Sequence, residues 1–105
     1  MAKIRGKVDG TLQAIAALLK AYESQHPESH SDLYRQNPAA VRIRIVDPSF
    51  VGRDRVERDD IVWKYLYKLA PEVRRDITVV LLLTPGEVAT SFANQDFEDP
   101  IPSRL

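Results

Sequence analysis

The sequence predicts an α+β fold, a small two-layer sandwich in which two helices cover one face of a mixed three-stranded sheet. Two segments, residues 10–24 and 57–69, carry apolar residues at the three- and four-residue spacing of amphipathic helices. Between them, residues 41–46 alternate apolar and polar side chains, as a half-buried strand does, and residues 77–83 form an apolar run of strand length. The expected order is helix, strand, strand, helix, strand, followed by an extended C-terminal tail.

The composition fits one domain. The chain has 105 residues, 15 Lys and Arg against 15 Asp and Glu, 44% apolar residues and no cysteine. A core of this size needs neither disulfides nor a structural zinc, and without cysteine the chain supplies no thiol nucleophile and no thiolate metal ligand. The formal net charge of zero argues against a dedicated nucleic-acid binder. We expect a domain over residues 1–88 and a tail over residues 89–105 that packs on it or is partly disordered.

The N-terminal ten residues are polar, and no apolar run approaches the length of about 18 residues that a membrane helix needs. We therefore expect a cytoplasmic protein without membrane contact.

The first helix is expected over residues 10–24. Its apolar residues recur at helical spacing: Val8, Leu12, Ile15, Ala16, Leu19 and Tyr22. Asp9 or Thr11 can act as the N-cap, because a short polar side chain accepts hydrogen bonds from the first free N–H groups of a helix. Pro27 ends the pattern.

A β-hairpin is expected next, with strands over residues 31–37 and 41–46. Residues 37–40, Asn-Pro-Ala-Ala, favour a turn because Asn bonds locally and Pro fixes φ. Alternation directs one set of side chains to the core: Val41, Ile43 and Ile45. The opposite face receives Arg42, Arg44 and Val46. We expect that second face to be partly basic and solvated.

A second helix and a last strand complete the domain. The helix over residues 57–69 has an apolar arc: Ile61, Val62, Tyr65, Leu66 and Leu69. Pro71 ends it. The unbroken run over residues 77–83 indicates an interior strand buried on both faces, and the helix before it allows a parallel connection to the hairpin.

Several residues of this half form a pattern that resembles the BolA-like family. They are Phe50-x-Gly52, Val56, Arg58, Ile61-Val62, Leu66, Leu69 and Thr84-Pro85-Gly86-Glu87. The similarity covers about Val41 to Val88. It implies a fold related to the type II KH topology, in a family whose members partner monothiol glutaredoxins around a [2Fe–2S] cluster or act as regulators.

The sequence departs from this family at the cluster ligands. The family's histidine next to Arg58 is Asp59 here, and a carboxylate is a hard ligand poorly suited to an iron–sulfur centre. The hairpin turn over residues 37–40 offers neither the His nor the Cys of the family's second ligand. We therefore expect no cofactor, and a structural role for Asp54 or Asp59 at the start of the second helix.

Structural roles are also expected for the first signature residues and for the two histidines. Phe50 anchors the loop in the core, and Gly52 supplies a φ angle that a side chain would forbid. His26 and His30 are four residues apart, which suggests a metal site with the acidic residues around them, but Pro27 breaks the helix that would align the two rings. Surface histidines are the favoured interpretation.

Six arginines cluster between residues 35 and 58: Arg35, Arg42, Arg44, Arg53, Arg55 and Arg58. In a KH-like fold they could face phosphates, although Gly52 stands alone where KH domains use a GXXG loop. The alternative is a solvated rim of ion pairs with nearby carboxylates: Asp47, Asp54, Glu57, Asp59 and Asp60.

Trp63 and Tyr67 lie beside the core arc of the second helix and need a cover. We favour the tail, through Phe92, Phe97 or Ile101; the alternative is a protein interface, where Trp and Tyr are enriched.

No residue constellation supports an enzyme. The sequence favours a non-enzymatic BolA-like interaction or regulatory module that binds a protein partner. The alternatives are a KH-like nucleic-acid-binding regulator that uses the arginine face, and a glutaredoxin partner in iron–sulfur handling. A homodimer is a further possibility for the partner.

Overall fold

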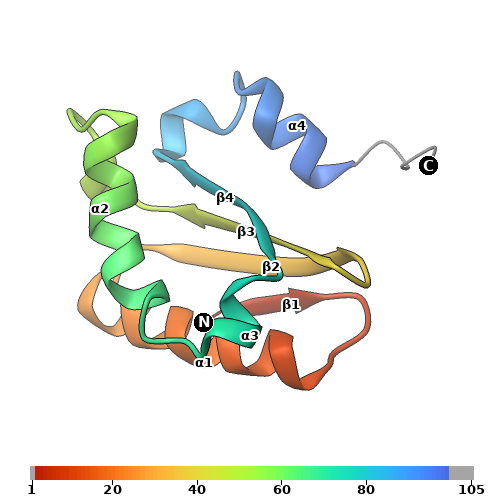
Figure 1. Ribbon diagram of the computed structural model, residues 1–105. Helices are drawn as coiled ribbons and strands as arrows, with labels where there is room; N and C mark the ends of the chain where they lie inside the picture. Colours follow the sequence, from red (N-terminus) through yellow and green to blue (C-terminus); the bar gives the residue numbers. More distant parts are fainter. Residues whose placement is uncertain (1, 100–105) are drawn as a thin grey trace.

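The computed structural model describes residues 2–99 as a four-stranded sheet with helices on both of its faces (Figure 1). The strands are β1 (Lys3–Arg5), β2 (His30–Asn37), β3 (Ala40–Val46) and β4 (Ile77–Leu83). The helices are α1 (Gly10–Gln25), α2 (Arg55–Leu66), α3 (Pro71–Arg74) and α4 (Phe92–Glu98). Two short 3₁₀ helices, η1 (Pro48–Phe50) and η2 (Pro85–Glu87), follow β3 and β4.

The sheet has the order β1-β2-β3-β4. The hairpin β2–β3 is antiparallel and β4 is parallel to β3, as predicted. The prediction of three strands is wrong, because residues 3–5 pair in parallel with β2 as a fourth strand. A strand of three residues with one apolar side chain is too short to show alternation, so the sequence pattern did not reveal it.

Helices α1 and α2 contribute to one hydrophobic core on one side of the sheet. Their fully buried residues are Leu12, Ile15, Leu19 and Tyr22 from α1, and Val62 and Leu66 from α2. The sheet adds Leu33, Val41, Ile43 and Ile45, all fully buried. The predicted core face of the hairpin is therefore confirmed, and α1 lies along the underside of the sheet in Figure 1.

The helix starts and the hairpin turn follow local chemistry. Asp9 caps α1 by accepting a hydrogen bond from the Leu12 N–H at 2.9 Å, and Asp54 forms a capping box with Glu57 at the start of α2. In the turn, the Ala39 N–H donates to Asn37 Oδ1 at 2.8 Å. Helix α2 ends at Leu66, three residues before the predicted end.

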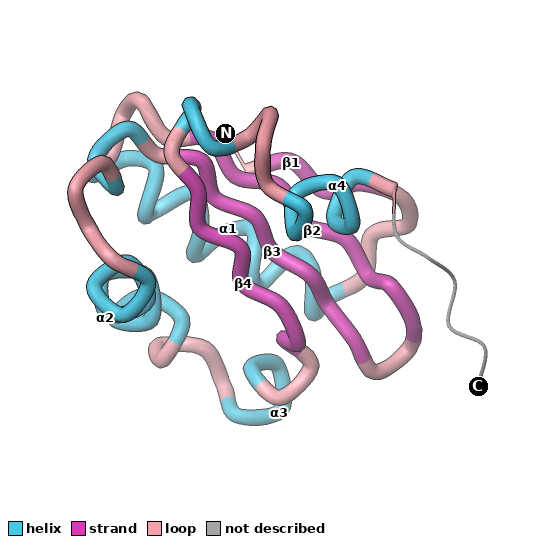
Figure 2. Tube along the Cα trace, turned by 90° about the horizontal axis from the view of Figure 1, so that it is seen from above, coloured by secondary structure: helices cyan, strands magenta, loops and turns pink. Residues whose placement is uncertain are grey.

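The tail contains a helix, which corrects the prediction of an extended segment. Ser91 caps α4 by accepting from the Asn94 N–H, and α4 lies across the sheet on the face opposite α1 (Figures 1 and 2). Phe97 is 1% exposed. The expected solvated face of β3 is therefore covered. A helix of seven residues is too short to give a helical period, so the sequence pattern predicted an irregular tail.

Strand β4 is an edge strand, and the prediction of an interior strand is wrong. Val79 is 37% exposed and Thr78 is also exposed, while only Leu82 and Leu83 of this strand are buried. An apolar run has the same pattern in a central strand as in an edge strand that is covered at one end, so periodicity could not separate the two.

Candidate functional site

The loop that leads from β3 into α2 is built on two residues of the family-like pattern. Phe50 is fully buried, and Gly52 has a φ of +79°, a conformation that a side chain would strain. Just before them, Asp47 caps η1 by accepting a hydrogen bond from the Ser49 N–H at 2.8 Å. The chain therefore leaves the sheet through a tight, anchored turn, and α2 begins beside β4. Val56, on the first turn of α2, is 68% exposed.

Arg58 ties the start of α2 to β4 and η2. Its Nη1 donates to the Leu82 carbonyl at 3.1 Å and to Glu87 Oε1 at 2.7 Å, and its guanidinium lies 5.7 Å from the centroid of the Phe50 ring. The hydrogen bond from Arg58, together with that from the Thr84 N–H, lowers the pKa of the Glu87 carboxyl to about 2. Arg58 is thus committed to an internal ion pair.

A groove with a volume of about 410 Å³ lies between the start of α2 and β4. It is lined by Arg53, Asp54, Arg55, Arg58, Asp59, Val80, Leu81, Leu82, Glu87 and Ala93. Asp59 thus lines this groove. Asp59 lies within α2, and its side chain makes no hydrogen bond or ion pair with another of residues 2–99. Arg53 reaches Glu57 only at 4.0 Å. The groove offers an apolar strand edge with charged side chains at its rim.

His26 takes part in a buried polar cluster. Its ring stacks on Tyr22 with centroids 4.1 Å apart, and its Nδ1 lies 3.3 Å from Asp47 Oδ2. The Tyr22 hydroxyl donates to the same oxygen at 2.6 Å, and burial together with Asp47 raises the pKa of Tyr22. His30 is exposed at the start of β2. Among the described residues, no group of three or more His, Asp or Glu could hold a metal ion.

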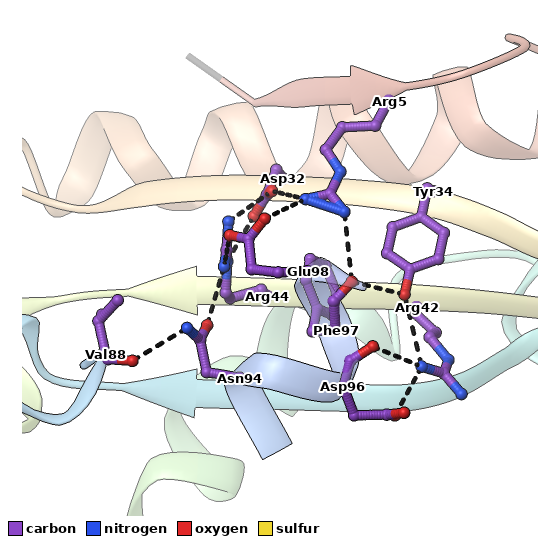
Figure 3. Close-up of polar contacts among 10 residues, drawn as sticks. All are labelled: Arg5, Asp32, Tyr34, Arg42, Arg44, Val88, Asn94, Asp96, Phe97 and Glu98. Atoms are coloured by element: carbon purple, nitrogen blue, oxygen red, sulfur yellow. Dashed lines mark hydrogen bonds and ion pairs between the residues drawn. The ribbon is translucent and has the colours of Figure 1, made fainter. Parts of the chain in front are cut away.

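A second polar site lies between the sheet and α4 (Figure 3). Arg44 makes two hydrogen bonds to Asp32, at 2.9 and 2.8 Å, and donates to Asn94 and Glu98 of α4. Burial would lower the pKa of the Arg44 guanidinium, but the hydrogen bonds to Asp32 and Glu98 outweigh burial and raise it. Arg42 donates to Asp96 Oδ2 at 2.8 Å.

Phe97 fills the centre of this second site. Its ring makes an edge contact with Tyr34 at 4.9 Å, and the guanidinium carbons of Arg44 and Arg5 lie 4.8 and 5.2 Å from its centroid. The Phe97 carbonyl accepts from the Tyr34 hydroxyl at 2.8 Å, and Arg5 pairs with Glu98 at 2.9 Å. Side chains from β1, β2 and β3 thus enclose one aromatic ring.

The six arginines of the sequence cluster do not form one exposed surface. Arg42 and Arg44 have side chains that are 13% exposed beneath α4, and Arg35 pairs with Asp9 at 2.7 Å. Arg53, Arg55 and Arg58 lie at the groove. Of the carboxylates expected as partners, Glu57 alone forms an ion pair with one of these arginines within the described chain.

The aromatic pair of α2 is not covered by the described part of the tail. Trp63 and Tyr67 contact each other with ring centroids 5.2 Å apart, and Tyr67 is 66% exposed. Phe97 packs on the far face of the sheet and Phe92 is 85% exposed, so the expected cover by these two residues is wrong. Ile101, the third candidate, lies outside the described residues.

Sequence reasoning missed Asn94, Asp96 and Glu98 as partners of the β3 arginines, and it missed Arg5, which pairs with Asp32 and Glu98. One signal was present: Ser91 is an N-cap residue that stands seven residues before Glu98 and nine before a proline, which is enough for a short capped helix.

The comparisons with known proteins do not place the chain: no family model, curated protein or solved structure matches it. Within residues 2–99, no helix has the length and apolar character needed to cross a membrane.

Proposed function

We propose that this chain is a non-enzymatic, BolA-like protein-interaction module that binds its partner without sharing an iron–sulfur cluster. One observation carries the proposal: Arg58 and Asp59, from the family-like pattern, line the same groove, with Phe50 packed beneath Arg58. The antiparallel hairpin, the helix and the parallel strand that follow one another here also agree with the topology that the resemblance implies.

A protein partner fits the surface around this groove. Val80 and Leu82 belong to an edge strand, and an edge strand can pair its unused backbone groups with an extended segment of another chain. Arg53 and Arg55 line the groove, and arginine side chains are enriched in protein interfaces. The bond from Arg58 to the Leu82 carbonyl occupies only one end of this edge.

The donor groups at the groove do not suit an iron–sulfur cluster. Asp59 supplies a carboxylate in place of imidazole, and the chain contains no thiol. The hairpin turn carries Asn, Pro and Ala, so a second nitrogen or sulfur ligand is missing there as well. The glutaredoxin-type alternative is therefore the weaker one, and recognition through the strand edge and the arginine rim is favoured.

Partner capture with matched variants tests the interaction proposal. Purified wild-type chain, Val80→Arg and a control, Val8→Arg, would be used as bait in extract from the source cells, and captured proteins would be re-tested as purified binary complexes. Val80→Arg places a charge at the strand edge, where Val80 also packs against the core, so circular dichroism would first establish that this variant folds as wild type does; Val8 is exposed elsewhere. We expect Val80→Arg to lose binary binding and Val8→Arg to keep it; equal binding by both would contradict the groove as the interface.

Reconstitution with a monothiol glutaredoxin tests the proposal that the chain binds its partner without sharing an iron–sulfur cluster. We expect no visible absorption band specific to a heterodimer from the wild-type chain. Asp59→His should not restore one, because the second ligand is also missing. A stable heterodimeric [2Fe–2S] species formed by the wild-type chain and lost on His30→Ala would overturn this part and make His30 a ligand.

A further inference from the structure

The face of the sheet beneath α4 has the features of a binding site that is occupied from within the chain. Arg42 and Arg44 project from β3, and Arg5 from β1 lies beside Tyr34 of β2 (Figure 3). Asp32 is the carboxylate of the sheet that pairs with Arg44 and, at 3.6 Å, with Arg5. Three arginines thus face one aspartate of the sheet, a local charge of +2, and α4 supplies the remaining carboxylates.

The contacts of α4 define what this face recognises. A phenylalanine ring fills the slot between Tyr34 and two guanidinium groups, and such cation–π contacts favour an aromatic ring over an aliphatic side chain. The carboxylates on either side of it pair with the arginines: Asp96 with Arg42, and Glu98 with both Arg44 and Arg5. The recognised pattern is an aromatic residue between two acidic residues on a short helix.

The attachment of α4 is suited to exchange. The helix has seven residues, a length that is unstable alone. The side chains of Asp96 and Glu98 are each 48% exposed, so water and salt compete for their ion pairs. Phe92 is 85% exposed and adds nothing to the contact. One buried ring, the hydrogen bonds from Tyr34 to the Phe97 carbonyl and from Arg44 to Asn94, and partly exposed ion pairs hold α4, aided by the high effective concentration of a tethered segment.

We propose that the sheet face formed by Arg5, Tyr34, Arg42 and Arg44 is a docking site for a helical segment of a partner protein that carries an aromatic residue between two acidic residues, and that α4 occupies this site until such a segment displaces it. The site lies on the opposite side of the sheet from the core, and only Ala93 of α4 also lines the α2–β4 groove.

A labelled peptide with the sequence of residues 91–99 serves as the probe. Its binding to the full chain would be measured by fluorescence anisotropy for wild type, Phe97→Ala and Phe92→Ala. Phe97→Ala removes the anchor of α4 and should bind the probe at least tenfold more tightly than wild type. Phe92→Ala changes an exposed ring of the same helix and should match wild type. A folded Phe97→Ala variant with unchanged probe affinity would overturn the proposal.

A second variant covers the case in which Phe97→Ala does not fold. Asp96→Asn with Glu98→Gln keeps the ring but removes the carboxylates, and should also tighten probe binding at least tenfold. Adding Arg42→Gln and Arg44→Gln to this variant should abolish the gain. If both α4 variants unfold, α4 is part of the folding unit and the proposal fails.

Two further measurements distinguish a partner peptide from other possible occupants of this sheet face. A single-stranded oligonucleotide that binds the opened variants as tightly as the peptide would show a general anion surface and overturn the assignment to a peptide. A wild-type dimer that forms with rising concentration and is lost in Phe97→Ala would identify a second copy as the occupant, which would likewise overturn it.

Discussion

Acid should weaken this fold in part through one carboxylate, Glu87. Hydrogen bonds from Arg58 and from the Thr84 N–H lower the pKa of this group from 4.5 to about 2 in the folded chain. A group whose pKa is lowered by folding stabilises the native state above its unfolded pKa, and that contribution disappears as the pH falls towards the folded pKa. The contribution of Glu87 is therefore complete above about pH 5 and is lost between about pH 4.5 and 2.

The expected contribution of Glu87 to the free energy of unfolding follows from its pKa change and from the exposure of its side chain. A lowering from 4.5 to about 2 would correspond to about 3.5 kcal/mol of unfolding free energy at about 1.4 kcal/mol per pKa unit. The Glu87 side chain is 44% exposed, so solvent screens its pairing with Arg58 and the larger figure does not apply. We expect about 1 kcal/mol, the upper end for an exposed ion pair.

Urea unfolding at several pH values between 7 and 2.5 measures this contribution. Glu87→Gln should be about 1 kcal/mol less stable than wild type at pH 7, and the difference should shrink as the pH approaches 2.5. Glu28→Gln, an exposed carboxylate without an ion pair among the described residues, is the matched control and should follow wild type at every pH. A difference between wild type and Glu87→Gln that stays constant with pH would refute the reasoning.

Three further substitutions test the core, the loop and the buried polar cluster by denaturant unfolding. Leu66→Ala empties a fully buried position and should cost about 2–5 kcal/mol, against less than about 0.5 kcal/mol for exposed Lys64→Ala; similar costs would mean that the helix phase is wrong. Gly52→Ala should cost about 1 kcal/mol from its φ of +79° alone, since open space surrounds the added Cβ, and an unchanged stability would contradict that conformation. Tyr22→Phe should cost about 1–3 kcal/mol because it removes a donor to buried Asp47, and a neutral result would show that another donor replaces the hydroxyl.

The parts of the fold that follow from local patterns could be predicted. The alternation over residues 41–46 gave the correct inner face of β3, because a strand that buries one face must place its apolar residues at every second position. The polar residues before each main helix, Asp9 and Asp54, act as N-caps for the same local reason.

The parts that depend on tertiary packing could not be predicted. Strand β1 has three residues and gains its backbone hydrogen bonds only by pairing with β2, about thirty residues away in the chain. Helix α4 is defined by a cap and by one buried ring whose slot is made by other elements. Neither segment carries a period of its own, and Ser91, the N-cap of α4, is the local signal that the two segments offer.

Among the candidate site residues, too, those with a local role could be predicted and those that depend on tertiary partners could not. Phe50 and Gly52 could be assigned structural roles because each depends on a single residue property, burial or φ. The arginines could not be assigned, because the sequence states their number and not their partners. Arg42 and Arg44 pair with carboxylates about fifty residues later in the chain. The acidic residues nearer in sequence do not pair with them: Asp54 caps α2, and Asp59 lines the groove.

The covered arginine face also changes what the net charge means. A formal charge of zero counts Asp96 and Glu98 against Arg42 and Arg44, and in the folded chain these groups do neutralise one another. Burying a guanidinium is costly unless carboxylates pair with it, so the sheet face and α4 are electrostatically a single unit while α4 is docked. When α4 leaves, the same composition presents a basic surface around Tyr34. The net charge of zero therefore argues against anionic partners only while α4 is docked. When α4 is displaced, an acidic segment is the partner that neutralises the exposed arginines.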